Sequence, residues 1–381
     1  MKKAILAGAL PALLTCGTAH AQSSVTLYGL IDEGLDFTNN ANGHRAYQMA
    51  SGYTRGTRWG IHGSEDLRDE LSAIFRLESG FDVNNGLLTQ GGAAFGRQAN
   101  VGLSSRRLGT LTMGVQYDPT ADLWSPFTSA GSMMGDMSAH PFGNDNAAWD
   151  YSIHNSVKYV SPTVAGFTGE AMYGFSNQAG GFADDRVYSA AGSYRMGSIS
   201  AALAYMKTNG GRATATGAVS TVTGVFAARS QQNIDAGLSY TFPNEAVVSL
   251  AYSHVDVYNP SANSFFQTQP GAGTQNSWKF DNYEINGKYY VKPDLWLGAA
   301  YTFTTAQVAT TTGHTTSRWN QVSVILDYDI SKRTSVYVDG SYQHVDGDAG
   351  LAFDNADIER SAGPSMSGNQ MVYRVSLLHR F

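Results

Sequence analysis

Apolar and polar residues alternate along much of the chain with the period of a β-strand. In residues 233–242, "NIDAGLSYTF", every second residue is apolar or small. The same pattern recurs in residues 283–291, 322–328 and 369–381. Successive side chains of a strand point to opposite faces, so each segment predicts a strand with one apolar and one hydrophilic face.

Short turns and long polar stretches separate the predicted strands in regular alternation. The seven short turns comprise residues 64–70, 106–109, 162–166, 196–198, 243–245, 292–294 and 330–333. The long stretches include residues 39–52, 208–230 and 259–277. With both termini on the short-turn side, this layout predicts an all-β fold: a 16-stranded antiparallel transmembrane β-barrel with short periplasmic turns and eight long extracellular loops.

The end of the chain suggests how such a barrel closes. The last segment has an apolar face made of Tyr373, Val375, Leu377 and Phe381. It can pair with the first predicted strand, residues 25–37, which leaves no unpaired sheet edge. A soluble β-sandwich or propeller would also show alternation, but an outward aromatic residue at the carboxylate favours the barrel.

Residues 1–21 have the three parts of a secretory signal peptide. Two lysines precede an apolar run, and Ala19-His20-Ala21 provides a small-x-small cleavage site. We therefore expect the barrel domain to comprise residues 22–381 and the single cysteine, Cys16, to be removed with the signal.

Composition and charge narrow the class of protein further. The net charge is −6, which argues against a nucleic-acid partner. The 42 glycines and 21 tyrosines, with only 10 prolines, suit many paired strands. No apolar run of about eighteen residues follows the signal, so a membrane-spanning helix is not expected and only a closed barrel would cross a bilayer.

Six segments make the chain resemble the general trimeric porins of Gram-negative bacteria, most closely those of β-proteobacteria. They are "SVTLYGLID", "TRWGIHGSEDL", "AIFRLESGF", "LGTLTMGVQYDP", "HNSVKYVSPTVAGF" and the terminal "HRF". The resemblance implies a homotrimer in the cell outer membrane that passes ions and small hydrophilic solutes by passive diffusion. It also implies contacts with outer-membrane lipid and lipopolysaccharide, and recognition of Phe381 by the barrel-assembly machinery.

The resemblance further implies a pore constriction, in which the third long loop folds inward and sets acids opposite arginines of the wall. The longest gap between short turns contains residues 118–150, which include five aspartates and no basic residue except His140. Asp122 and Asp136 are the acids that we expect to face the wall. An ordinary solvated surface loop is the alternative.

Strand alternation predicts which wall residues face the lumen. Arg58 alternates with apolar neighbours, as do Arg76 and Glu78, and an arginine facing lipid at the bilayer midplane would cost about 2–4 kcal/mol. Arg97 matches the family's arginine by its spacing to "GL" at 102–103, although Gln98 and Asn100 would then face outward. The alternative is that these are ordinary hydrated lumen residues.

Two departures from the family weaken the expected cationic wall. Relatives often carry basic residues where this chain has Val115 and Ser152. With an acidic loop and Glu78 beside Arg76, we expect weak selectivity with a slight preference for cations. Glu33 breaks the outward apolar pattern of the first strand, and a subunit contact is the only explanation that we can offer.

Two other functions belong to different classes. A barrel adhesin or structural protein would fill its lumen with large apolar side chains, whereas the inward positions here are mostly Asn, Asp, Ser, Glu and Lys. A hydrolase needs a base within about 3 Å of its nucleophile. In "HNS" at 154–156, adjacent residues point to opposite faces, so we expect a channel and no enzyme, with no cofactor or metal.

Overall fold

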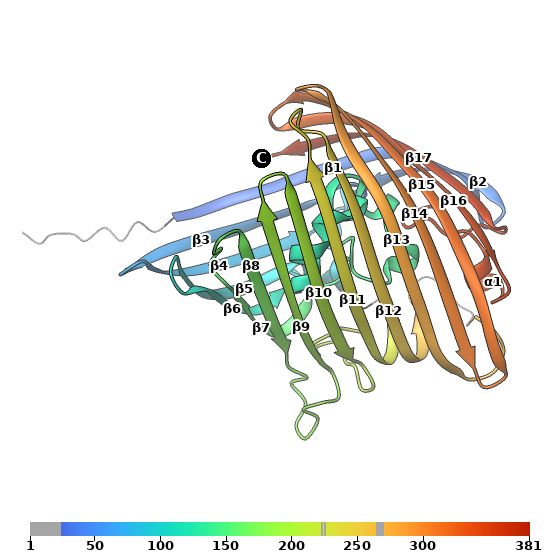
Figure 1. The fold of residues 1–381 in the computed structure, drawn as a ribbon, viewed down its shortest axis with the longest axis horizontal. Helices are drawn as coiled ribbons and strands as arrows, with labels where there is room; N and C mark the ends of the chain where they lie inside the picture. Colours follow the sequence, from blue (N-terminus) through green and yellow to red (C-terminus); the bar gives the residue numbers. More distant parts are fainter. Residues whose placement is uncertain (1–23, 222–223, 225, 264–269) are drawn as a thin grey trace, which may run out of the picture.

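The computed structural model describes residues 24–221, 224, 226–263 and 270–381. They form a closed antiparallel barrel in which the last strand, β17 (Asn369–Arg380), pairs with the first, β1 (Ser24–Ala41) (Figure 1). The predicted signal segment, residues 1–21, lies outside the described residues. Within the described part of the chain, no helix is long and apolar enough to cross a membrane.

Seventeen strand segments occupy sixteen positions in the barrel. β2 (His44–Ser51) and β3 (Arg58–Arg68) pair with successive halves of β1 and together fill one position. The predicted sixteen-stranded barrel is therefore confirmed. The other strands are β4 (Leu71–Gly80), β5 (Gln98–Ser105), β6 (Gly109–Gln116), β7 (Ile153–Val160), β8 (Phe167–Gly174), β9 (Arg186–Met196), β10 (Ile199–Asn209), β11 (Phe226–Thr241), β12 (Val247–Asn263), β13 (Gln275–Lys292), β14 (Leu295–Thr310), β15 (Gly313–Ser331) and β16 (Thr334–Gly347).

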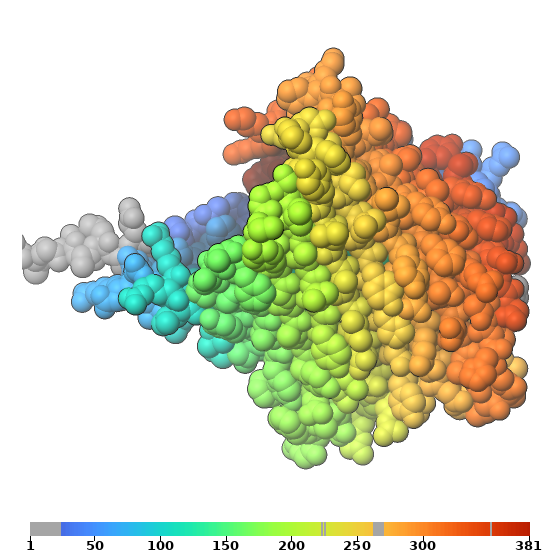
Figure 2. Space-filling view, viewed as in Figure 1, coloured from blue at the N-terminus to red at the C-terminus, as the bar shows by residue number. Residues whose placement is uncertain are grey.

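The barrel wall is low on one side and tall on the other. β5 to β8 have 8 residues each, whereas β11 to β15 have 16 to 19. Figures 1 and 2 show the long strands, coloured yellow to orange, forming the tall side. A tilted strand of about 9–11 residues spans a bilayer, so the long strands extend beyond it.

Each of the seven predicted short turns coincides with a short connection between strands, but two expected long loops are tight turns. The sequence predicts a loop over residues 39–52. Instead β1 continues to Ala41, and Asn42 and Gly43, with φ of 51° and 85°, turn the chain into β2. Asn-Gly is a favoured two-residue hairpin turn because both residues tolerate positive φ. Thr311 and Thr312 join β14 to β15 in a similarly short connection.

The two faces of the strands differ as the alternation predicted. In β17, Tyr373, Val375 and Leu377 are exposed on the outside of the barrel, while Arg374 and Ser376 are buried inside. Phe37 of β1 packs against Tyr373, with ring centroids 4.8 Å apart, so the outward aromatic residues also join neighbouring strands. The outer wall is thus apolar, and the lumen wall is polar except for a buried apolar cluster that includes Trp278, Phe280 and Trp319.

Closure of the barrel involves the last residue of the chain. The Phe381 amide donates to the Gly29 carbonyl at 3.0 Å, and the Gly29 amide donates to the Phe381 carbonyl at 3.2 Å. The aromatic ring lies so close to Gly29 that a Cβ there would be 2.5 Å from Cζ of Phe381. A glycine in β1 is therefore required for this contact.

Candidate pore constriction

The connection between β6 and β7, residues 117–152, folds into the barrel, and we call it the inner loop. Its helical turns are η2 (Thr120–Trp124), η3 (Ser125–Phe127), η4 (Ala130–Met134), η5 (Gly135–Ser138) and η6 (Pro141–Gly143). Trp124 and Phe127 are buried against Ala202, Ala204 and Ala251, which are inward-facing alanines of β10 and β12. Small side chains on that wall leave the space that the loop occupies.

Hydrogen bonds fix the inner loop to the tall wall. Trp124 Nε1 donates to the Ala236 carbonyl at 2.9 Å, and Asn286 Nδ2 donates to the Phe127 carbonyl at 2.8 Å. The Asn286 bond is buried and the Trp124 bond is partly buried, so leaving these groups unpaired would be costly. The loop is therefore held at one side of the lumen, and the remaining passage lies opposite.

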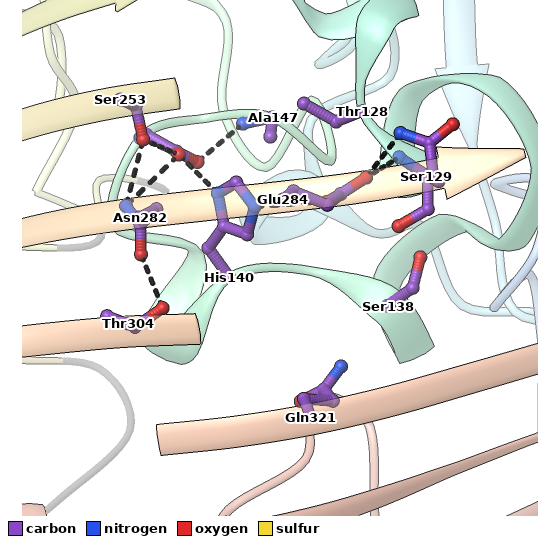
Figure 3. A network of polar contacts seen from close by, with 12 residues as sticks. Thr128, Ser129, Ser138, His140, Ala147, Ser253, Asn282, Glu284, Thr304 and Gln321 are labelled. Carbon is purple, nitrogen blue, oxygen red and sulfur yellow. Dashed lines mark hydrogen bonds and ion pairs between the residues drawn. The ribbon is translucent and has the colours of Figure 1, made fainter. Parts of the chain in front are cut away.

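His140 is the centre of the most buried of these attachments (Figure 3). Its Nδ1 lies 2.5 Å from Asp145 Oδ2, and its Nε2 lies 3.1 Å from Glu284 Oε2 on β13. Asn282 and Ser253, on β13 and β12, bond to each other at 2.8 Å beside it. Burial alone would lower the pKa of His140, but the two carboxylates raise it to about 10.

His140→Gln should loosen the inner loop at every pH, because it leaves Asp145 and Glu284 buried without a cation. In the wild type the raised pKa means that the attachment is complete at neutral pH and is lost as the pH rises through about 10. Single-channel current noise should therefore rise above about pH 10 in the wild type and already at pH 7 in the variant. His314→Gln, at an exposed position, is the control. Equal noise in the two variants would contradict this role of His140.

The predicted wall residues Arg58 of β3, Glu78 of β4 and Arg97, which precedes β5, come together inside the barrel. Arg97 Nε donates to Glu78 Oε1 at 2.8 Å, and Arg58 Nε lies 3.6 Å from Glu78 Oε2. Tyr28 donates its hydroxyl to Glu78 Oε2 at 2.8 Å. Glu78 thus offsets part of the charge of the two arginines and fixes their positions.

Arg97 reaches the lumen without following strand alternation. β5 begins one residue later, at Gln98, and Gln98 and Asn100 pair with Glu78 and Arg76 on the inward face. The sequence argument against Arg97 fails because Arg97 precedes the strand. Arg76 is exposed and shares the inward face with Glu78, but it does not line the narrow cavity beside the inner loop.

The two predicted loop acids have partners other than the three predicted arginines. Asp122 forms an ion pair with Lys158 of β7. Asp136 Oδ2 accepts from Arg360 Nε at 2.8 Å, and Arg360 comes from the connection before β17. Of these two acids, Asp136 lines the cavity that Arg58 and Arg97 also line, and Asp122 does not.

That cavity, of about 300 Å³, lies between the inner loop and the part of the wall around β1, β3 and β17, and we call this candidate the constriction. Its charged lining residues are Arg55, Arg58, Arg97, Arg360, Arg380, Asp136 and Asp150. Arg380 precedes the outward-facing Phe381, so the alternation of strand faces could have predicted that Arg380 faces the lumen. Arg55 and Arg360 lie in irregular segments, where no sequence period applies.

Asp150 and Arg55 show how crowded these charges are. Burial and the neighbouring Asp136 raise the pKa of Asp150 to about 7. Burial, followed by the nearby Arg380 and Arg58, lowers the pKa of Arg55. Arginine nevertheless stays protonated in proteins, so the constriction combines fixed positive charge with acids that repel one another.

Comparison with known proteins agrees with this architecture. A family model described as Gram-negative porin matches residues 6–349. An outer membrane porin protein of Bordetella pertussis is 32% identical over 387 residues, which cover 90% of this chain and 94% of that protein. The anion-selective porin from Comamonas acidovorans superposes with a TM-score of 0.72 at 20% identity, covering 94% of this chain and all of that chain.

A second solved structure shares the fold. The trimer form of OmpT from Vibrio cholerae has a TM-score of 0.65 at 16% identity, with 94% of this chain and 99% of that chain covered. The matches point to a channel protein, not an enzyme. The chain belongs to the Gram-negative porin family and is an outer-membrane channel for passive diffusion.

Proposed function

We propose that ions and small hydrophilic solutes pass through the constriction and that anions are preferred. The supporting observation is its lining, which carries five arginines and two aspartates. Rings of fixed charge select ions by sign. This reverses the slight cation preference expected from sequence, because that expectation did not count Arg55, Arg360 and Arg380.

The test is reconstitution of the refolded mature chain into planar bilayers under a KCl gradient. We expect large stepwise conductance. The sign of the reversal potential should show that chloride is more permeant than potassium. The preference should fade as the Debye length falls from about 30 Å at 0.01 M to about 3 Å at 1 M salt. A cation-selective wild type would contradict the proposed constriction.

A homotrimer is the proposed assembly, as in the trimer form of OmpT. Glu33 supports it, because this residue points outward between Ile31 and Leu35 and both its carboxylate oxygens are buried without a hydrogen-bond partner in the described residues. A neighbouring subunit can supply the missing donor. Contacts with lipopolysaccharide and the assembly machinery, and removal of residues 1–21 as a signal peptide, belong to the same proposal.

Phe381 is the proposed recognition mark for barrel assembly. Deletion of Phe381 should lower the amount of folded protein in the outer membrane, because both the mark and the two backbone hydrogen bonds to Gly29 are lost. Molecules that do fold should keep their single-channel conductance, since Phe381 is outside the constriction. Phe381→Tyr, which keeps the ring and the backbone bonds, is the control. Normal assembly of the deletion variant would show that Phe381 is not the recognition mark and only contacts lipid.

A further inference from the structure

Three carboxyl groups meet at the edge of the constriction. Asp136 and Asp150 come from the inner loop, and Glu359 comes from the connection between β16 and β17. One oxygen of each lies within 4.8 Å of the others. Two oxygens on opposite sides of a calcium ion, each about 2.4 Å from it, would be about 4.8 Å apart. A single ion can therefore contact all three.

The carboxylates lack the donors that buried acids need. The Glu359 carboxyl is buried, and Glu359 Oε2 and Asp150 Oδ2 are shielded from solvent without a hydrogen-bond partner in the described part of the chain. Ionised carboxylates only accept hydrogen bonds, so these two can bond to each other only when one of them holds a proton. Asp136 has one cationic partner, Arg360, at 2.8 Å. One guanidinium thus faces three acids.

We propose that Asp136, Asp150 and Glu359 bind a divalent cation of the calcium type, with water completing its coordination. The donors are all oxygens, which suit hard cations, and no histidine or cysteine belongs to the cluster. Calcium tolerates irregular coordination better than magnesium does. Asp136 and Asp150 also line the constriction, so the ion can enter from the pore.

A bound cation would have two consequences for the channel. It would join the inner loop to the connection before β17, through Asp150 and Glu359. It would also add positive charge beside the five arginines of the constriction and so increase the preference for anions. This second consequence rests on the proposed function, whereas binding itself does not.

The test uses terbium, a luminescent substitute for calcium, on the refolded mature chain in detergent. Trp149 lines the constriction next to Asp150 in the chain and can transfer excitation to the ion. We expect saturable terbium emission that calcium displaces, with a calcium Kd of about 10⁻⁴–10⁻³ M. Glu359→Gln should weaken binding by at least about tenfold, as expected for loss of one charged ligand.

Asp357→Asn is the matched control, because Asp357 lies in the same connection but outside the cluster. It should bind like the wild type. Asp150→Asn is a second variant, used if Glu359→Gln fails to show the gel shift of a folded barrel. Absent emission, emission that calcium does not displace, or equal affinity in wild type and a folded cluster variant would overturn the proposal. These results do not depend on conduction, so they leave the channel function untouched.

Discussion

Replacing Arg55 and Arg58 together by glutamine should abolish the anion preference of the channel. A unit charge about 8 Å from a passing ion in water contributes about 0.5 kcal/mol, with opposite sign for anions and cations. Loss of two charges should therefore change the anion-to-cation permeability ratio by roughly tenfold at low salt, after allowance for screening. Reversal potentials in a KCl gradient measure this ratio.

The structure suggests that this double variant will fold. Arg58 lies 3.6 Å from Glu78, and Arg97 keeps its closer pair with that acid at 2.8 Å. Arg55 contributes one hydrogen bond, from Nη2 to the Ser132 carbonyl at 2.6 Å. Arg76→Gln is the matched control, because Arg76 is on the lumen face but outside the constriction lining. An equal change of the permeability ratio in the control would show that the constriction does not set the selectivity.

Arg374→Met should destabilise the barrel by about 3–5 kcal/mol, because it leaves two buried carboxylates without their cation. Arg374 is fully buried on β17, and its Nη2 and Nη1 lie 3.0 Å from Asp32 and 3.2 Å from Asp36, both on β1. Nη1 also donates to the Ala50 carbonyl of β2 at 2.8 Å. The guanidinium therefore joins the last strand to the first two strand segments, where the barrel closes.

The free energy of unfolding in urea measures this loss, with the gel shift of the folded form as a second readout. Asp32→Asn and Asp36→Asn, combined with Arg374→Met, should recover much of the lost stability, because the uncompensated charges are then gone. Arg374→Lys should be intermediate, because lysine keeps the charge but not the planar fork. If Arg374→Met is as stable as the wild type, the network does not hold the closure.

The alternation of apolar and polar residues was sufficient to predict the barrel wall from the sequence. A strand has only two faces, so an apolar outer face forces polar residues such as Arg374 and Glu78 inward. The same argument places Arg58 inward. Strand pairing also places Val115. Leu77 pairs with Ala99, and Ala99 pairs with Val115, so all three lie on the outward face. A basic residue at Val115 would therefore not be expected to line the lumen here.

The constriction was only partly predictable, because it is built from irregular segments. Asp136 and Asp122 belong to the same acidic loop, but three-dimensional packing brings Asp136 to Arg360 and Asp122 to Lys158. Arg360 reaches the constriction from a connection more than 200 residues further along the chain, as the 224-residue separation of Arg360 and Asp136 shows. Nothing in a local pattern encodes such a contact.

Cysteine modification of the constriction would test the channel path most directly. The predicted mature chain has no cysteine, so Ala148→Cys, in the constriction lining, would provide a single thiol. Leu203→Cys on the outer wall is the control, because Leu203 is 70% exposed there. We predict stepwise conductance from both folded variants and a large drop, on adding a bulky thiol reagent, for Ala148→Cys alone. A folded but silent barrel, or full conductance after complete modification of Ala148→Cys, would contradict the account.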